Sequence, residues 1–174
     1  MQEHWVAKKK RSDAKRDERA RTMLKKIAPE LITSKLITFA IDQKKPESSI
    51  TKEYCESIVD ELRKVSKYES YKYLRGSSLR FEFYTAGDKF NPHCHIEAQT
   101  HMQNGEMAEL YRRKFMPEKN PTKWGIYRVN VVERSEKATF SYVIEALKTE
   151  SKMPHVLKDN KFKLERDIDI LYVI

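Results

Sequence analysis

The chain has 174 residues, which predicts one domain with a buried core and an appendage. Its 35 Lys and Arg outnumber 26 Asp and Glu to give a formal net charge of +9, which favours a polyanionic partner, most simply nucleic acid. Two cysteines far apart exclude a disulfide framework, and the apolar runs are too short for a bilayer span. No signal-peptide pattern is evident, so we expect a cytoplasmic protein without a membrane partner.

Most of the basic excess lies near the N-terminus. Residues 7–26 hold ten Lys and Arg but three Asp and Glu, an excess of seven positive charges. This segment predicts a solvated helix or an arm that becomes ordered on its partner. We assign residues 1–30 to this arm and residues 31–174 to the main domain. The side chains expected to contact nucleic-acid phosphates are Lys8, Lys9, Lys10, Arg11, Lys15 and Arg16.

The first elements of the domain are a strand, a helix and a second strand. Residues 35–41 form a short β-branched apolar run, which indicates a buried strand. Thr51 is positioned to cap a helix over residues 52–67, whose apolar stripe has helical spacing. Residues 78–85 alternate between apolar and polar side chains, which predicts a strand with one buried face.

A hairpin and a helical segment follow. Residues 86–92 contain Gly, Asn and Pro and predict a hairpin loop, after which residues 93–102 return as a strand. Residues 105–116 predict a mixed helix, residues 124–133 a further strand and residues 137–149 another helix.

The C-terminal part is less regular. Pro154 is expected to interrupt the chain, and residues 168–174 form an apolar run that predicts a terminal strand. The predicted elements together indicate an α+β fold, with an antiparallel central β-sheet flanked by helices.

Two histidines on the returning strand are the sharpest local signal. His93 and His95 lie two residues apart, so their imidazoles share one face of the strand, and Cys94 points to the other face, into the core. A phosphate-chemistry cation such as Mg²⁺ or Mn²⁺ also needs oxygen ligands. Glu82 on the polar face of the preceding strand can supply one, and Glu97 competes for that role. Two histidines exposed on a hairpin without any metal are the simpler alternative.

A tyrosine on the predicted helix over residues 137–149 is the candidate nucleophile. The apolar residues of this helix form one narrow arc, and Tyr142 lies far round the helix from it. A phenol on the polar side can attack a phosphodiester when a metal polarises the phosphate. An ordinary surface tyrosine is the alternative. The apolar residues of the arc are Phe140, Val143, Ile144 and Leu147.

These segments together resemble the HUH endonucleases of the rolling-circle replication-initiator (Rep) type. KLITFAI (35–41) resembles the first motif strand of that family, and LRFEFYTAGDKFNPHCHIEA (79–98) resembles its metal-binding hairpin. YRVNVVERSEKATFSYVIEALK (127–148) resembles the strand and helix that carry the catalytic tyrosine. The resemblance covers roughly residues 34–150 and implies the family's ferredoxin/RRM-like palm.

The resemblance implies a DNA replication activity. Members of the family cleave single-stranded DNA at an origin hairpin or loop, form a covalent 5′-phosphotyrosine link and later rejoin the strand. Carried over to this chain, His93, His95 and Glu82 become ligands of Mg²⁺ or Mn²⁺, Tyr142 the nucleophile and Lys148 an assisting catalytic residue. The host would supply the polymerase and the helicase.

The chain departs from the family pattern at two positions. Many relatives have Lys three residues after the catalytic tyrosine, where this chain has Glu145. Either Lys148 takes this role from the next turn, or the role is absent. Some relatives have a second tyrosine four residues on, where this chain has Ala146. Two other functions stay open: a non-catalytic, basic nucleic-acid-binding protein, and a transposase of the same HUH superfamily.

Overall fold

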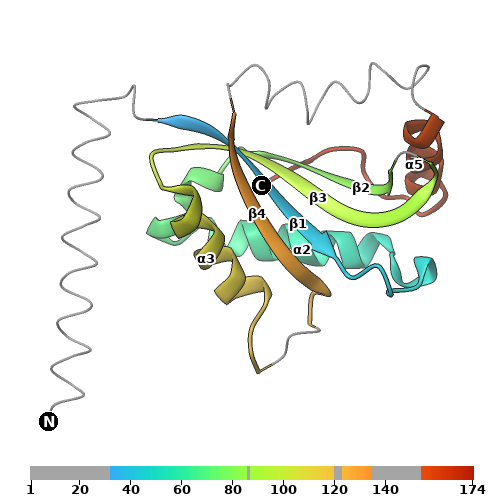
Figure 1. Cartoon of the computed structure of the whole chain (residues 1–174), viewed down its shortest axis with the longest axis horizontal. Helices are drawn as coiled ribbons and strands as arrows, with labels where there is room; N and C mark the ends of the chain where they lie inside the picture. Colours follow the sequence, from blue (N-terminus) through green and yellow to red (C-terminus); the bar gives the residue numbers. More distant parts are fainter. Residues whose placement is uncertain (1–31, 86, 120–122, 135–153) are drawn as a thin grey trace, which may run out of the picture.

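The computed structural model describes residues 32–85, 87–119, 123–134 and 154–174 (Figure 1). The predicted helix over residues 137–149 and the predicted N-terminal arm lie outside the described residues. Among the helices that the structure describes, none combines the length and the apolar composition needed to cross a bilayer.

The described residues build one open, five-stranded sheet in which every paired strand is antiparallel to its neighbour. The strands are β1 (Thr33–Ile41), β2 (Ser78–Thr85), β3 (Lys89–Thr100), β4 (Ile126–Arg134) and β5 (Tyr172–Val173). Their spatial order is β4-β1-β3-β2-β5, so β1, β3 and β2 lie inside the sheet (Figure 1). The predicted α+β class with an antiparallel central sheet is confirmed.

Helices accompany the sheet as expected. They are α2 (Lys52–Val65), α3 (Asn104–Phe115) and α5 (Pro154–Glu165), with short 3-10 helices η2 (Glu47–Ser49) and η3 (Glu69–Leu74). The Thr51 hydroxyl accepts a hydrogen bond from the backbone N–H of Tyr54 at 3.2 Å, which confirms the predicted cap of α2. Ile58, Leu62 and Val65 are buried, so the predicted apolar stripe of this helix faces the core.

The two faces of the sheet have different characters. On one face, the Phe39 ring of β1 packs against Tyr111 and Phe115 of α3, with ring centroids 5.3 and 4.9 Å away. On the other face, Thr38 of β1 lies opposite His95 of β3, which lies opposite Arg80 of β2. Because side chains alternate along a strand, one apolar face forms the core and the other carries a row of polar groups.

A β-bulge shapes the hairpin between β2 and β3. The register shifts between Glu82 and Tyr84, so that Asn91 and Pro92 of β3 face the single residue Phe83 of β2. The predicted loop over residues 86–92 is therefore too long, because the strand already begins at Lys89. Proline cannot donate a hydrogen bond to the sheet, and a bulge is one of the few places in a strand where it is tolerated.

The C-terminal part was predicted wrongly. Pro154 does not interrupt the chain but begins α5, because the first helical residue needs no N–H partner and proline already has the helical φ. Asp167, with φ of 55°, follows the helix in the left-handed conformation common at helix ends. The predicted strand over residues 168–174 shortens to Tyr172–Val173, which pairs only with the start of β2.

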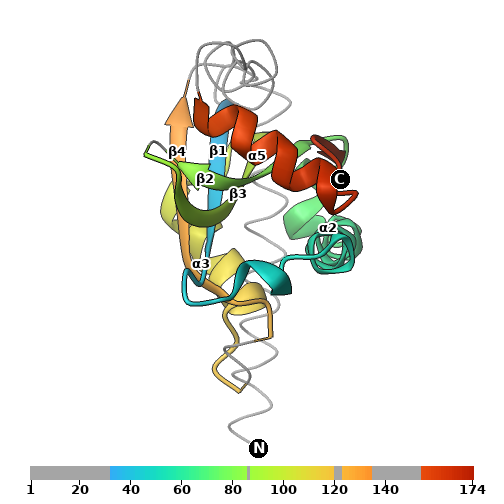
Figure 2. The ribbon, with the colours of Figure 1, turned by 90° about the vertical axis from the view of Figure 1, so that its right-hand side faces the viewer.

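Helix α5 lies beside β2 (Figures 1 and 2) and is held there by a buried acidic residue. Asp159 Oδ1 accepts hydrogen bonds from the backbone N–H groups of Phe83 and Tyr84, at 2.6 and 3.3 Å. Its other oxygen forms an ion pair with Lys163 Nζ at 2.7 Å, and the two side chains are only 3% and 0% exposed. The phenyl ring of Phe162 packs against Phe83, with centroids 4.9 Å apart. Helix α5 thus fixes the segment of β2 that lies opposite the bulge of β3.

The Lys163→Met substitution should destabilise the protein strongly. It leaves the carboxylate of Asp159 buried without its cation, which typically costs about 3–5 kcal/mol. We expect a loss of this size in the free energy of unfolding measured with urea. The control is Lys161→Met on the same helix, since Lys161 is 77% exposed and its ion pair should contribute little. Equal, small losses for both variants would show that the buried pair does not hold α5.

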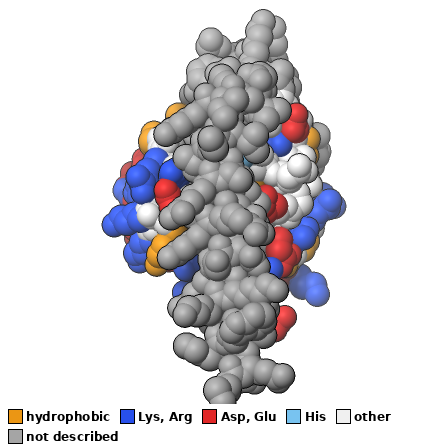
Figure 3. All heavy atoms as spheres, turned by 90° about the vertical axis from the view of Figure 1, so that its left-hand side faces the viewer, with side chains coloured by type: hydrophobic (Ala, Val, Ile, Leu, Met, Phe, Trp, Pro, Cys, Tyr) orange, Lys and Arg blue, Asp and Glu red, His pale blue; other side chains and the backbone are white. Residues whose placement is uncertain are grey.

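Charges of both signs cover the described surface. On the face in Figure 3, Lys and Arg side chains lie on both flanks and are interspersed with Asp and Glu. Since residues 7–26 account for seven of the nine net positive charges, the remainder of the chain has a net charge of only +2. Net charge alone therefore does not mark a nucleic-acid surface outside residues 7–26.

Candidate metal centre

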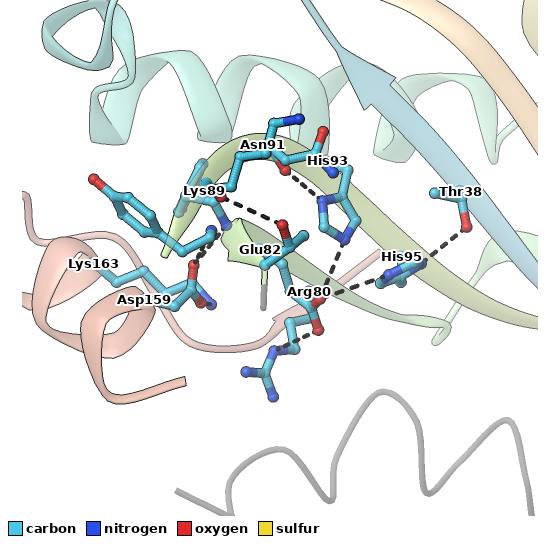
Figure 4. A network of polar contacts seen from close by, with 12 residues as sticks. Thr38, Arg80, Glu82, Lys89, Asn91, His93, His95, Asp159 and Lys163 are labelled. Atoms are coloured by element: carbon cyan, nitrogen blue, oxygen red, sulfur yellow. Dashed lines mark hydrogen bonds and ion pairs between the residues drawn. The ribbon is translucent and has the colours of Figure 1, made fainter. Parts of the chain in front are cut away.

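The candidate site lies on the polar face of the sheet, where β2 and β3 pair. Glu82 stands directly opposite His93 in the register, and His95 follows two residues along β3 on the same face. Glu82 Oε2 lies 3.2 Å from His93 Nε2 and 3.8 Å from His95 Nε2 (Figure 4). One ligand atom from each of the three residues lies within 4.8 Å of the others, which is close enough for a single metal ion to bind all three.

The far nitrogen of each imidazole is also engaged. His93 Nδ1 lies 2.7 Å from the backbone oxygen of Asn91, and His95 Nδ1 lies 2.9 Å from the hydroxyl of Thr38. A carbonyl oxygen only accepts hydrogen bonds, so His93 Nδ1 carries the proton and Nε2 is the nitrogen left to bind a metal. Such outer contacts are typical of metal-binding histidines, because they fix the ring and its tautomer. The β-bulge at Asn91 supplies one of them.

The burial of His93 and His95 argues against the alternative that they are ordinary surface histidines without a metal. The side chains of His93 and His95 are 12% and 7% exposed, and that of Glu82 is 21% exposed. Two imidazoles exposed on a solvated hairpin would be hydrated by water and would not need to share one largely buried carboxylate. The partial exposure of Glu82 leaves an approach to the group from solvent.

The protonation states suit a cation. Burial raises the pKa of the Glu82 carboxyl, but the hydrogen bond from His93 and the neighbouring positive charges outweigh burial and hold that pKa at about 2. Burial lowers the pKa of His95 to about 4. For His93, burial lowers the pKa, but the hydrogen bond and charge of Glu82 outweigh it and leave the pKa above its ordinary value. At neutral pH a metal would thus meet an ionised carboxylate and a neutral His95, and it would compete with protons for His93.

The structure distinguishes the two candidates for the oxygen ligand. Glu82 belongs to the converging group of described residues, and Glu97 does not. Glu97 lies on the same face but pairs with Leu36 of β1, two positions further along β3 than His95. A two-histidine, one-carboxylate set suits several divalent ions and leaves coordination positions for water or substrate.

The centre is surrounded by three further groups, none of which the sequence singled out as site residues. Thr38 contacts His95 from β1, and Arg80 lies beside Glu82, with its Nε 3.6 Å from Oε1. The ion pair of Asp159 and Lys163 lies on α5, where Asp159 contacts the backbone of β2 opposite the bulge. Arg80 could have been suspected, because it shares the polar face of its strand with Glu82. Asp159 and Lys163 gave no sequence signal, since they come from a helix more than seventy residues away in the chain.

The other predicted site residues lie outside the described residues. Tyr142 and Lys148 belong to the predicted helix over residues 137–149. The basic residues of the N-terminal arm are Lys8, Lys9, Lys10, Arg11, Lys15 and Arg16. Their predicted roles stay predictions.

The Thr38→Val substitution should weaken metal binding without touching a ligand. Valine has nearly the same shape, but it removes the hydroxyl that holds His95 Nδ1. Loss of such an outer contact typically lowers metal affinity about 10- to 100-fold, which a Mn²⁺ titration followed by electron paramagnetic resonance would measure. Thr33→Val on the same strand is the matched control, because its hydroxyl contacts the backbone of Thr100 and the side chain of Glu133 rather than either histidine. Equal affinities for the two variants would exclude this role for Thr38.

No protein-family model matches the chain, and a search of curated proteins finds no match. What the protein does must therefore be inferred from the metal-binding geometry and from the resemblance of its motifs.

Proposed function

We propose that this protein is a metal-dependent endonuclease of the HUH, Rep-like type, which nicks and rejoins single-stranded DNA through a 5′-phosphotyrosine intermediate. The observation that carries the proposal is the convergence of Glu82, His93 and His95 on one face of a hairpin. This is the ligand set, and the place in the chain, that the resemblance to that family implies.

Mg²⁺ or Mn²⁺ is the proposed metal. A carboxylate and two neutral imidazoles would hold the ion from one side, and the remaining positions would be open to water and a phosphodiester. The ion would supply Lewis-acid polarisation of the phosphate. The chain's own contribution is to hold the ligands rigidly, through the bulge carbonyl of Asn91 and the hydroxyl of Thr38.

The position of β4 supports Tyr142 as the nucleophile. β4 pairs with β1, and β1 pairs on its other side with β3, the strand that carries the two histidines. Its last residue, Arg134, is close enough to His95 for its charge to disfavour protonation of that imidazole, although burial has the larger effect on the pKa. The segment that leads to Tyr142 starts at Arg134, which is level with Ser34 and Gln99 and so four positions along the sheet from His95. It has eight residues in which to reach the metal centre. Lys148 lies six residues further on.

Single-stranded DNA is the proposed substrate, and the basic arm would add phosphate contacts that raise affinity without choosing the sequence. Replication initiation and transposition use the same chemistry, so a transposase of this superfamily is a variant of the same proposal. A non-catalytic, basic nucleic-acid-binding protein is the alternative from another class, in which the metal group would have no chemical role.

The test is covalent capture of DNA by the full chain. The protein is incubated with a library of single-stranded hairpins in Mn²⁺, denatured and separated by electrophoresis. We expect a protein–DNA adduct that disappears when EDTA is added before the DNA. Binding of the hairpins without any adduct would favour the non-catalytic alternative.

A further inference from the structure

We propose that Arg80 is the anion-binding residue of the metal centre and contacts a non-bridging oxygen of the phosphate once the metal is bound. The inference deepens the proposed function, because it uses the same Glu82, His93 and His95 group. It adds a substrate-binding residue on β2 that the family resemblance does not supply.

The guanidinium of Arg80 is buried and short of hydrogen-bond partners. Arg80 is 1% exposed, and its Nε and Nη1 atoms have no hydrogen-bond partner in the described part of the chain. A guanidinium carries five donor N–H groups and cannot lose its charge. Because a buried charged donor without a partner is costly, such a residue is expected to have a ligand other than the residues that the structure describes.

The Arg80 donors that have no partner among the described residues lie next to the metal centre. Figure 4 shows the Glu82 carboxylate between the imidazoles on one side and the Arg80 guanidinium on the other. Oxygen Oε2 of Glu82 faces His93 and His95, whereas Oε1 faces Arg80 Nε at 3.6 Å, which is longer than a hydrogen bond. The carboxylate can therefore give one oxygen to a metal and still leave the Arg80 donors available to a neighbouring anion.

The charge of the loaded centre requires an anion. Without metal, and with His93 neutral, the positive charges of Arg80 and Lys163 balance the negative charges of Glu82 and Asp159. A divalent cation bound by Glu82 and two neutral imidazoles would leave two positive charges in excess in a largely buried site. Mutual repulsion between the cation and the Arg80 guanidinium would then weaken metal binding, unless an anion bridges them. A phosphate group has the oxygen atoms to contact both at once.

The proposal predicts that metal and phosphate bind cooperatively. Mn²⁺ affinity of the full chain is measured by electron paramagnetic resonance with and without millimolar inorganic phosphate, after subtraction of Mn²⁺–phosphate association in buffer. We expect phosphate to raise the Mn²⁺ affinity of the wild type about 5- to 100-fold, a usual range for coupled sites. Relaxation of the ³¹P resonance by the bound Mn²⁺ should place the phosphate next to the metal.

The Arg80→Met variant separates anion binding from support of Glu82. If Arg80 binds the anion, this variant should lose the phosphate effect while binding Mn²⁺ alone as tightly as the wild type, or more tightly, because a positive charge beside the ion is gone. If Mn²⁺ binding alone is weakened, Arg80 acts by holding Glu82 and the proposal is overturned. Arg112→Met, on the exposed side of α3, is the matched control and should keep full coupling.

Two further results would also overturn the proposal. One is a wild type in which phosphate leaves Mn²⁺ affinity unchanged, and the other is an Arg80→Met variant that keeps the coupling. If Arg80→Met does not fold, Arg80→Lys carries the test, since it keeps the charge but not the planar donor pair, and its coupling should fall severalfold. No DNA is used, so a negative result leaves the adduct test of the proposed function untouched.

Discussion

The Tyr142→Phe variant should form no covalent adduct with single-stranded DNA in Mn²⁺. Phenylalanine keeps the ring but lacks the phenolic oxygen that would attack phosphorus, so the expected loss is complete rather than partial. The measurement is adduct yield after denaturing electrophoresis, with a hairpin that the wild type captures. Mn²⁺ affinity of the variant should equal that of the wild type, because no ligand has changed.

Tyr127→Phe is the control for that experiment. Tyr127 lies on β4 and is 51% exposed, so its phenol is as available to solvent as a surface nucleophile would be. It should retain the full adduct yield. An undiminished adduct in Tyr142→Phe would exclude Tyr142, and a loss in Tyr127→Phe alone would move the nucleophile to β4.

Substitution of a metal ligand should strongly reduce both Mn²⁺ affinity and adduct formation, an effect second only to that of Tyr142→Phe on the adduct. His93→Ala removes one of the three ligand atoms, and Glu82→Gln removes the negative charge of another. We expect Mn²⁺ affinity to fall by at least about 100-fold, since even outer contacts contribute about 10- to 100-fold. Adduct formation should fall with it. Metal bound only to the native state raises the melting temperature, so this Mn²⁺-dependent increase should also disappear.

Two matched controls belong with the ligand variants. His155→Ala removes a histidine of α5 that lies outside the converging group, and Glu97→Gln removes the carboxylate that competed with Glu82 in the sequence. Both should bind Mn²⁺ as the wild type does. Equal losses in Glu97→Gln and Glu82→Gln would show that the metal lies further along β3 than the geometry indicates.

Local signals in the sequence were enough for the central strands and the first ligands. Period-two alternation predicted residues 78–85 as a strand, and the i, i+2 spacing placed His93 and His95 on one face. The same reasoning put Cys94 into the core, where it is fully buried. These features depend only on neighbours in the chain, which is why the pattern reveals them.

Segments governed by contacts distant in sequence were predicted less well. Pro154 suggested an interruption, whereas it begins a helix that Asp159 and Phe162 anchor against β2. The strand expected at the C-terminus extends only as far as its pairing with Ser78 and Leu79 allows. Nothing near these residues in the chain indicates which edge of the sheet they will meet.

By itself, the sequence determined that the fold is α+β, that an antiparallel hairpin carries two histidines on one face, and that Glu82 and Glu97 were the candidate oxygen ligands. Only the tertiary structure decided between those two carboxylates, because strand register sets Glu82 opposite His93. It also brought Thr38 from β1 to His95, and placed beside Glu82 an Arg80 guanidinium whose Nε and Nη1 have no hydrogen-bond partner among the described residues. The physical reason is that side-chain alternation is local, whereas register and burial depend on how distant strands pair and pack.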